Sequence, residues 1–314
     1  MAARAEAWPE LSAARLWPTI ETLQLWAQIV GKVRLSQTPW LNHGWHVTLR
    51  VSARGLSTGL IPHGVVGFSM EFDVIAGALV IRVSDGGERR IVLKSGTVAD
   101  FYAEVQEALS ALGVACRIDL TPDEMAEATP FPLDERFRTY DPEVARDYWR
   151  ALLQVDRVFN LFRTGFLGKC SPIQLFWGAF DLAVTRFSGR PAPLHPGGVL
   201  NLPDAVTREA YSHEVASAGF WPGDPGREPA FYAYAYPAPA GFDAATVAPL
   251  AAHWDAGLGE FILPYAAVRA EAGPDAARGA FLEGAYEAAA DLAAWDRAAL
   301  ECPRGTPRRP RRVC

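Results

Sequence analysis

The chain contains 314 residues, half of them hydrophobic, and has a formal net charge of −6 at neutral pH, a composition with ample material for a globular core. Because five arginines and no acidic residue follow Cys302, the rest of the chain carries −11, which argues against a broad nucleic-acid-binding surface. Four scattered cysteines without a C-x-x-C pair argue against a zinc knuckle or a disulfide framework, and with no signal peptide and no long apolar run we expect a cytoplasmic protein without a membrane span.

The first half of the chain is predicted to begin and end with a helix. The first helix is expected from about Leu16 to Gly31, which would end it. The second is expected between Thr97, a capping residue, and Gly113. Between these helices, alternating apolar and polar residues predict one antiparallel meander whose apolar face, including Val47, packs on a helix. The strands of this meander are expected at residues 46–51, 68–74, 79–83 and 91–94.

The second half of the chain follows a similar order. A helix is expected to start at Pro142, directly after the capping residue Asp141. Another is expected to open at Pro274, and residues 301–314, rich in proline and arginine, are predicted to be a disordered basic tail. Strands are expected within residues 171–188, where the chain would bend at Gly178, and at residues 211–220, 231–236 and 260–263.

These elements predict an α+β fold in which two similar halves, each ordered as helix, antiparallel meander and helix, pack as one globular unit. An internal duplication is one interpretation of this similarity. A single α+β domain without internal symmetry is the other. The expected organisation is an N-terminal half, a proline-rich and acidic connector, a C-terminal half and the tail, at residues 1–120, 121–141, 142–300 and 301–314.

Six segments of the chain have a distinctive sequence, and these are residues 26–35, 42–46, 168–191, 195–198, 211–223 and 231–237. Taken together, they resemble a bacterial family that is known only as a domain of unknown function. The resemblance spans about residues 8–297 and implies a complete bacterial protein, but that family has no assigned activity from which a catalytic role could be carried over.

Polar residues on the predicted strands are the candidates for a functional site. Tyr232 and Tyr234 emerge on one face of a strand because they are two residues apart, and the alanines between them predict a helix packed closely on the other face. If the polar faces of the two halves converge, the groove between them would hold titratable groups partly out of water. The candidate catalytic residues are His46, His213, Glu214 and Tyr234, and the candidate ligand-binding residues are Arg50, Glu71, Tyr232, Trp177 and Trp221.

A transition-metal site is a further hypothesis. A site with two histidines and one carboxylate would draw on His46, His213 or His195 together with Glu214 or Glu260. The spacing of these residues gives this hypothesis no direct support. The alternative is that the histidines line a groove or its rim and form ordinary hydrogen bonds.

Two functions of different classes follow from this pattern. The first is an enzyme that acts on a small molecule in the groove, with or without a metal. The second is a non-catalytic binding or assembly protein that uses an aromatic surface around Trp177, Phe220 and Trp221. Either function predicts that the protein binds a small molecule or a protein partner. Neither function predicts binding to nucleic acid or to a membrane.

Overall fold

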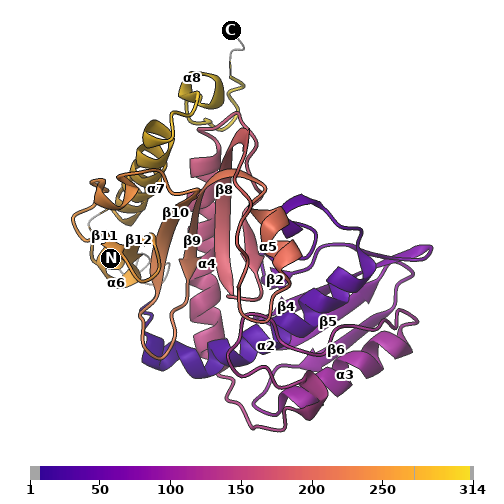
Figure 1. The fold of residues 1–314 in the computed structure, drawn as a ribbon. Helices are drawn as coiled ribbons and strands as arrows, with labels where there is room; N and C mark the ends of the chain where they lie inside the picture. Colours follow the sequence, from indigo (N-terminus) through magenta and orange to yellow (C-terminus); the bar gives the residue numbers. More distant parts are fainter. Residues whose placement is uncertain (1–7, 272, 312–314) are drawn as a thin grey trace.

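The computed structural model describes residues 8–271 and 273–311 and has an α+β fold built from two antiparallel sheets (Figure 1). One continuous hydrophobic core contains buried residues of both sheets, such as Phe72 in the first and Phe220 in the second. The first half consists of α2 (Ala13–Gln37), η1 (Asn42–Gly44), β1 (Arg50–Val51), β2 (Gly55–Ser57), β3 (Ile61–His63), β4 (Val66–Asp73), β5 (Ala78–Val83), β6 (Glu88–Val92) and α3 (Val98–Ala111). The rest consists of η2 (Phe131–Leu133), α4 (Pro142–Arg163), β7 (Gln174–Phe176), β8 (Asp181–Pro191), α5 (Asp204–Ala210), β9 (His213–Trp221), β10 (Ala230–Tyr236), η3 (Phe242–Ala244), β11 (His253–Asp255), β12 (Glu260–Pro264), α6 (Tyr265–Ala270), α7 (Pro274–Leu292) and α8 (Arg297–Leu300).

The first sheet has the strand order β1-β2-β4-β5-β6, with β3 paired to the other end of β4. The alternation predicted for residues 68–74 is confirmed, because Phe68, Met70 and Phe72 are buried. Phe72 stacks on Phe101 of α3, with 6.5 Å between the ring centroids. The predicted cap of this helix is also confirmed, since the Thr97 hydroxyl accepts a hydrogen bond of 2.9 Å from a backbone N–H of the first turn.

The strand predicted at residues 46–51 is wrong over most of its length, because only Arg50 and Val51 form a strand. The preceding residues interact with the second half of the chain. Leu49 pairs with Leu175, and the Val47 carbonyl accepts a hydrogen bond of 2.9 Å from the Trp177 indole. These long-range contacts hold the segment as a loop despite its alternating sequence.

The predicted end of the first helix is also wrong, because α2 continues past Gly31 to Gln37. Gly31 has a different role. The Trp177 indole lies against its Cα, in the space that any larger side chain would fill. The glycine therefore permits a close approach between the helix and the second half of the chain.

The second sheet has the order β11-β12-β10-β9-β8-β7 (Figure 1). Helices α4 and α7 cover one face of it. The helix predicted on the alanine side of the tyrosine strand is α7, where Leu282 and Ala285 approach Ala233 of β10 and Ala218 of β9. The bend predicted in residues 171–188 is confirmed as the turn between β7 and β8.

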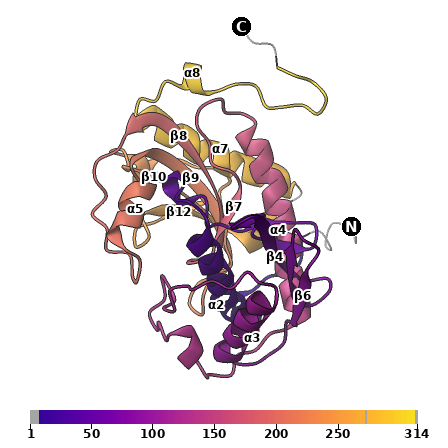
Figure 2. The same cartoon turned by 90° about the vertical axis from the view of Figure 1, so that its right-hand side faces the viewer.

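Two long loops and α5 lie on the other side of the second sheet, near the carboxyl-terminal half of α2 (Figure 2). The loop before α5 joins the connector between the halves. The Glu124 N–H donates to the Leu200 carbonyl at 3.0 Å, and the Asn201 amide donates to the Met125 carbonyl at 2.7 Å. Neither α5 nor this pairing was predicted, because both depend on partners distant in sequence.

The basic tail differs from its prediction over the residues that the structure describes. The Gly305 N–H donates to the Thr164 hydroxyl at 3.0 Å, and Arg304 forms an ion pair of 3.2 Å with Glu283. These contacts contradict the expected disordered tail at residues 301–314 for the part that the structure describes, and residues 312–314 lie outside the described range.

The predicted α+β class is confirmed, and the two sheets share one core. The internal duplication is not confirmed and stays a prediction. Among the described residues, no helix combines the length and the apolar character needed to cross a membrane.

Candidate functional site

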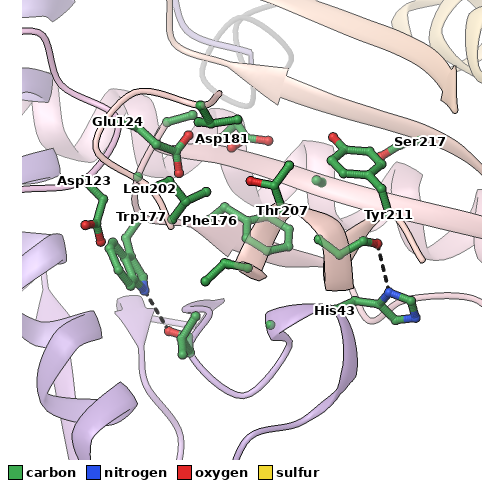
Figure 3. A pocket seen from close by; sticks show the side chains of 18 of the residues that line it. His43, Asp123, Glu124, Phe176, Trp177, Asp181, Leu202, Thr207, Tyr211 and Ser217 are labelled. Carbon is green, nitrogen blue, oxygen red and sulfur yellow. Dashed lines mark hydrogen bonds between the residues drawn. The ribbon is translucent and has the colours of Figure 1, made fainter. Parts of the chain in front are cut away.

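A cavity of about 980 Å³ lies against the face of the second sheet that α4 and α7 leave uncovered. This volume is in the range of small-molecule binding sites. Its floor consists of side chains from β8, β9, β10 and β12, and its other walls come from α2, η1, the connector and α5 (Figure 3). The cavity therefore lies between the second sheet and the segments that the first half and the connector place over it, and the polar faces of the two sheets do not meet there.

Strand alternation determines which side chains form the floor. In an antiparallel strand every second residue points to the same face. Asp181, Ala183 and Thr185 of β8 therefore line the cavity, while the residues between them face the helices. The other floor residues follow the same rule and are Val215, Ser217, Trp221, Tyr232, Tyr234, Glu260 and Ile262.

Asp181 and Tyr232 form a hydrogen-bonded pair on the floor. The Tyr232 hydroxyl donates a hydrogen bond to the Asp181 carboxylate, which has only 8% of its surface exposed. Tyr232 pairs with Gly219 of β9, and its ring lies over that glycine, in space that a Cβ atom would occupy. Gly219 thus allows Tyr232 to reach across β9 to β8. Burial raises the pKa of Asp181 to about 6, although the hydrogen bond from Tyr232 lowers it.

Two further carboxyl groups lie near Asp181. Glu124 lines the cavity from the connector and Glu260 from the start of β12, and Figure 3 shows Glu124 beside Asp181. Glu124 is an exposed residue, and its carboxyl lies where a side chain on Gly178 would be. Removal from water raises the pKa of each glutamate to about 7, and the negative charge of Asp181 adds to both shifts.

Hydroxyl groups occupy the floor beside the carboxyls. The hydroxyls of Tyr211 and Tyr234 are hydrogen-bonded to each other at 2.9 Å, and those of Thr185 and Ser217 also at 2.9 Å. Burial raises the pKa of Tyr234 well above its usual value, so this tyrosine stays protonated. The floor therefore offers hydrogen-bond donors and acceptors inside largely apolar walls.

On the connector side of the cavity, the positive charge of Lys32 is balanced by two aspartates. The Lys32 ammonium lies 2.9 Å from Asp123 and 3.3 Å from Asp119. It also lies 5.7 Å from the centroid of the Trp177 ring, and that ring is fixed by its hydrogen bond to the Val47 carbonyl. Lys32 thus ties α2 to the connector and closes one end of the cavity.

Two histidines, His43 and His46, also line the cavity, and Figure 3 shows His43 on the side opposite Asp123 and Trp177. His43 Nδ1 lies 2.9 Å from the Ala210 carbonyl and must donate to it, so His43 Nε2 accepts a hydrogen bond from the Lys169 ammonium. His46 Nδ1 accepts from the Leu41 N–H at 3.2 Å, which leaves the hydrogen on Nε2. That buried nitrogen has no hydrogen-bond partner among the described residues. Burial lowers the pKa of both histidines, which favours their neutral forms.

Residues 8–302 match a family of unknown function (DUF5996). The chain belongs to this family. This agrees with the resemblance described above, and the family brings no assigned activity. Comparison with curated proteins and with solved structures found no match.

Five of the predicted site residues line this cavity. They lie in the turn after η1, in the turn between β7 and β8, and in strands β9 and β10, and are His46, Trp177, Trp221, Tyr232 and Tyr234. His46 lines the same cavity as Tyr234 and Glu260, whereas direct proximity of His46 or His213 to Glu214, Tyr234 or Glu260 stays a prediction. Of the residues named for an aromatic binding surface, Phe220 is buried in the core, and Trp177 and Trp221 line the cavity.

The other four predicted residues do not line the cavity. Glu214 points to the helix-covered face, where it pairs with Arg190 at 2.7 Å. His213 lies at the start of β9, with its ring centroid 6.1 Å from that of His43. The two remaining residues, Arg50 and Glu71, form hydrogen bonds away from the cavity. Arg50 donates to the Ile173 carbonyl at 2.7 Å, and Glu71 accepts from Ser52 at 2.6 Å.

The residues named for a metal site are not brought together. His195 stacks on Tyr211 with 4.8 Å between the ring centroids, away from His46. Within residues 8–271 and 273–311, no group of three or more histidine, cysteine, aspartate or glutamate side chains is arranged to hold a metal ion.

Sequence reasoning missed the carboxyls that characterise the cavity. Asp181 was overlooked although it is a charged residue within the aromatic and apolar run 180–187, which is an unusual place for one. That position was the available signal. Glu124 and Asp123 gave no signal, because they belong to an acidic, proline-rich segment of the kind that is normally solvated.

Proposed function

We propose that this protein is an enzyme that transfers protons to and from a small organic molecule bound in the cavity. One observation carries the proposal: three carboxyl groups with pKa values raised to about 6 and 7 line a cavity of about 980 Å³. General acids and bases work best when their pKa lies near the working pH. Perturbed carboxyls in a cleft are a common feature of such sites.

Asp181 is the proposed base, and Glu124 and Glu260 are the proposed acids. Asp181 has the lowest pKa of the three and receives a hydrogen bond from Tyr232, so it loses its proton first. Its negative charge then favours the protonated form of the two glutamates. The three groups influence one another and titrate as a set. A substrate between them would meet a proton acceptor and proton donors at the same pH.

Tyr232 is proposed as a positioning residue. Its hydroxyl fixes one oxygen of Asp181, which orients the other for a proton on the ligand. The buried wall of Trp177 and the apolar side chains around it limit access of water to these groups. We also propose that the protein is bacterial and cytoplasmic, as expected from its sequence.

The experiment that tests this proposal assumes no particular substrate. The purified full-length protein is incubated with a bacterial metabolite extract, and compounds that disappear or form are followed by mass spectrometry. The wild type and Glu107→Gln, an exposed change on α3 outside the cavity, should alter the same compounds. Asp181→Asn should alter them at least about a hundredfold more slowly, which is the usual contribution of a general base.

The alternative is a non-catalytic protein that only binds a small molecule. The apolar and aromatic walls favour it as much as they favour an enzyme. The two functions are separated by the same experiment. A compound that stays bound to the protein but is never converted supports the binding protein. Conversion at equal rates by wild type and Asp181→Asn would contradict the proposed acid–base role.

A further inference from the structure

We propose that the ligand of this cavity is an organic cation, a protonated or quaternary amine whose nitrogen lies among Asp181, Glu124 and Glu260. This inference rests on the proposed function, because it takes the same cavity as the ligand site. It adds the class of ligand, which the acid–base argument leaves open.

The charges around the cavity are unbalanced. Five carboxyl groups and two cationic side chains line it. Lys32 is held by Asp119 and Asp123, and Arg227 is on an exposed loop between β9 and β10. The three remaining carboxyls have no ion-pair partner among the described residues, and these are Asp181, Glu124 and Glu260. A cation between them would supply the missing positive charge, whereas an anion would be repelled.

Buried charges elsewhere in the protein are paired, so the imbalance is specific to the cavity. Arg138, with 5% of its side chain exposed, lies 2.8 Å from Glu21 and 2.9 Å from Asp134. Asp73 is paired with Arg54. Unpaired buried charge is costly. Asp181 is buried and has no cation beside it among the described residues, and the more accessible Glu124 and Glu260 line the same cavity, which makes this cavity complementary to a positive ligand.

The walls supply a second, independent feature. Aromatic rings attract cations through the negative charge of their faces. The cavity already shows this chemistry at its edges, because Lys32 lies 5.7 Å from the Trp177 ring and Lys169 lies 5.3 Å from the Trp45 ring. Aromatic side chains also stand at other walls of the same cavity, including Trp40, Phe176, Trp221, Tyr232 and Tyr234. Acid groups combined with such rings are suited to an amine more than to a neutral or anionic ligand.

The pH dependence of binding follows from the groups that surround the three carboxyls. A cation favours their ionised forms, so binding should release protons and become tighter as the pH rises through about 6 to 7. Tyrosines facing the same carboxyls stay protonated in this range, because burial raises their pKa values. The groups that face the three carboxyls are Tyr211, Tyr232, Tyr234, Asp123, Asp255 and Lys32.

The test uses three probes of nearly the same shape and different charge. Choline is the cation, 3,3-dimethylbutan-1-ol replaces its nitrogen with carbon, and 3,3-dimethylbutanoate is an anion. Binding is measured by calorimetry and by tryptophan fluorescence at about pH 5 and pH 8, on either side of the shifted pKa values. We expect choline to bind at least about tenfold tighter than the alcohol at the higher pH, with a smaller preference at the lower pH.

Variants show where the cation binds. Glu260→Gln and Glu124→Gln should each weaken choline binding by about fivefold to tenfold and leave binding of the alcohol unchanged, whereas Glu107→Gln should change neither. The inference would be overturned if choline and the alcohol bound equally well, if the anion bound more tightly than choline, or if choline did not bind. None of these results bears on conversion by Asp181, which the metabolite experiment measures, so the two proposals fail separately.

Discussion

Replacing Asp181 with asparagine should make the protein more stable at alkaline pH, although it alters a buried hydrogen-bonded residue. Asparagine has nearly the same shape as aspartate, and its side-chain oxygen can still accept the hydrogen bond from Tyr232. The substitution replaces the ionisable carboxyl with an amide that stays neutral at every pH. Its effect therefore isolates the free-energy cost of holding a negative charge at this position.

The magnitude follows from the shift in pKa. Burial raises the pKa of Asp181 from 3.8 to about 6, and two pKa units correspond to about 3 kcal/mol. A carboxyl whose pKa is higher in the folded state holds its proton more tightly there. Its contribution to stability is complete below about pH 4 and is lost as the pH rises through about 6. Near pH 8 the wild type lacks this contribution, and Asp181→Asn should be more stable than the wild type by up to about 3 kcal/mol.

Urea unfolding followed by tryptophan fluorescence, at about pH 4 and pH 8, measures the difference. The two proteins should be of similar stability at the acidic pH and diverge at the alkaline pH. Glu107→Gln, on the exposed face of α3, should show no such divergence. A loss of stability in Asp181→Asn of the same size at both pH values would refute the reasoning, because it would mean that the carboxylate stabilises the fold.

Two glycine substitutions test the cavity walls. Gly31→Ala should lower the free energy of unfolding by about 1–3 kcal/mol, because a methyl group there overlaps the Trp177 indole. Gly284→Ala on α7, where a methyl group would make only ordinary van der Waals contacts, should raise it by about 0.5–1 kcal/mol in urea unfolding. Gly178→Ala should displace the flexible Glu124 carboxyl at a stability cost below about 1 kcal/mol and return the pKa of Glu124 toward its ordinary value, as followed by NMR titration. An unchanged Glu124 titration, or a Gly31→Ala protein as stable as the Gly284→Ala protein, would contradict this account of the walls.

Elements governed by local sequence were predicted well. α3 has its capping residue, its apolar stripe and its terminating glycine within a short segment, and the structure reproduces all three. The same holds for the start of α4, where Asp141 accepts hydrogen bonds from the first turn. Nothing outside these segments is needed to specify them.

Elements governed by distant partners were not predicted. The sequence around Gly31 is typical of a helix end, and only the position of Trp177 explains why the glycine lies inside a helix. Likewise, alternation in residues 46–49 predicts a strand, but a bridge to Leu175 and the bond from Trp177 hold it as a loop. In both cases the deciding contact joins residues more than a hundred positions apart, which single-sequence periodicity does not report.

The candidate site was predicted in part for the same reason. Tyr232 and Tyr234 follow from strand alternation alone, and both line the cavity. Glu214 was assigned to the site because it is polar, yet its position in β9 has the opposite parity to Ser217, so it faces the helices and pairs with Arg190. Parity within one strand is readable from the sequence. Which of the two faces borders a cavity depends on where the helices pack.

The conflict between local rules and the fold is concentrated at one place. Most of the second sheet obeys the expected pattern, with apolar residues such as Phe220 and Phe231 packed under α4 and α7. On the opposite face, Asp181 is buried without a cation and the ring of Tyr232 is accommodated only because position 219 is a glycine. An apolar residue at position 181 would avoid the cost of the buried carboxyl. Departures of this kind from a stable core are expected where residues serve function instead of folding. Their convergence on one cavity is therefore the strongest physical reason to place the function of this protein there.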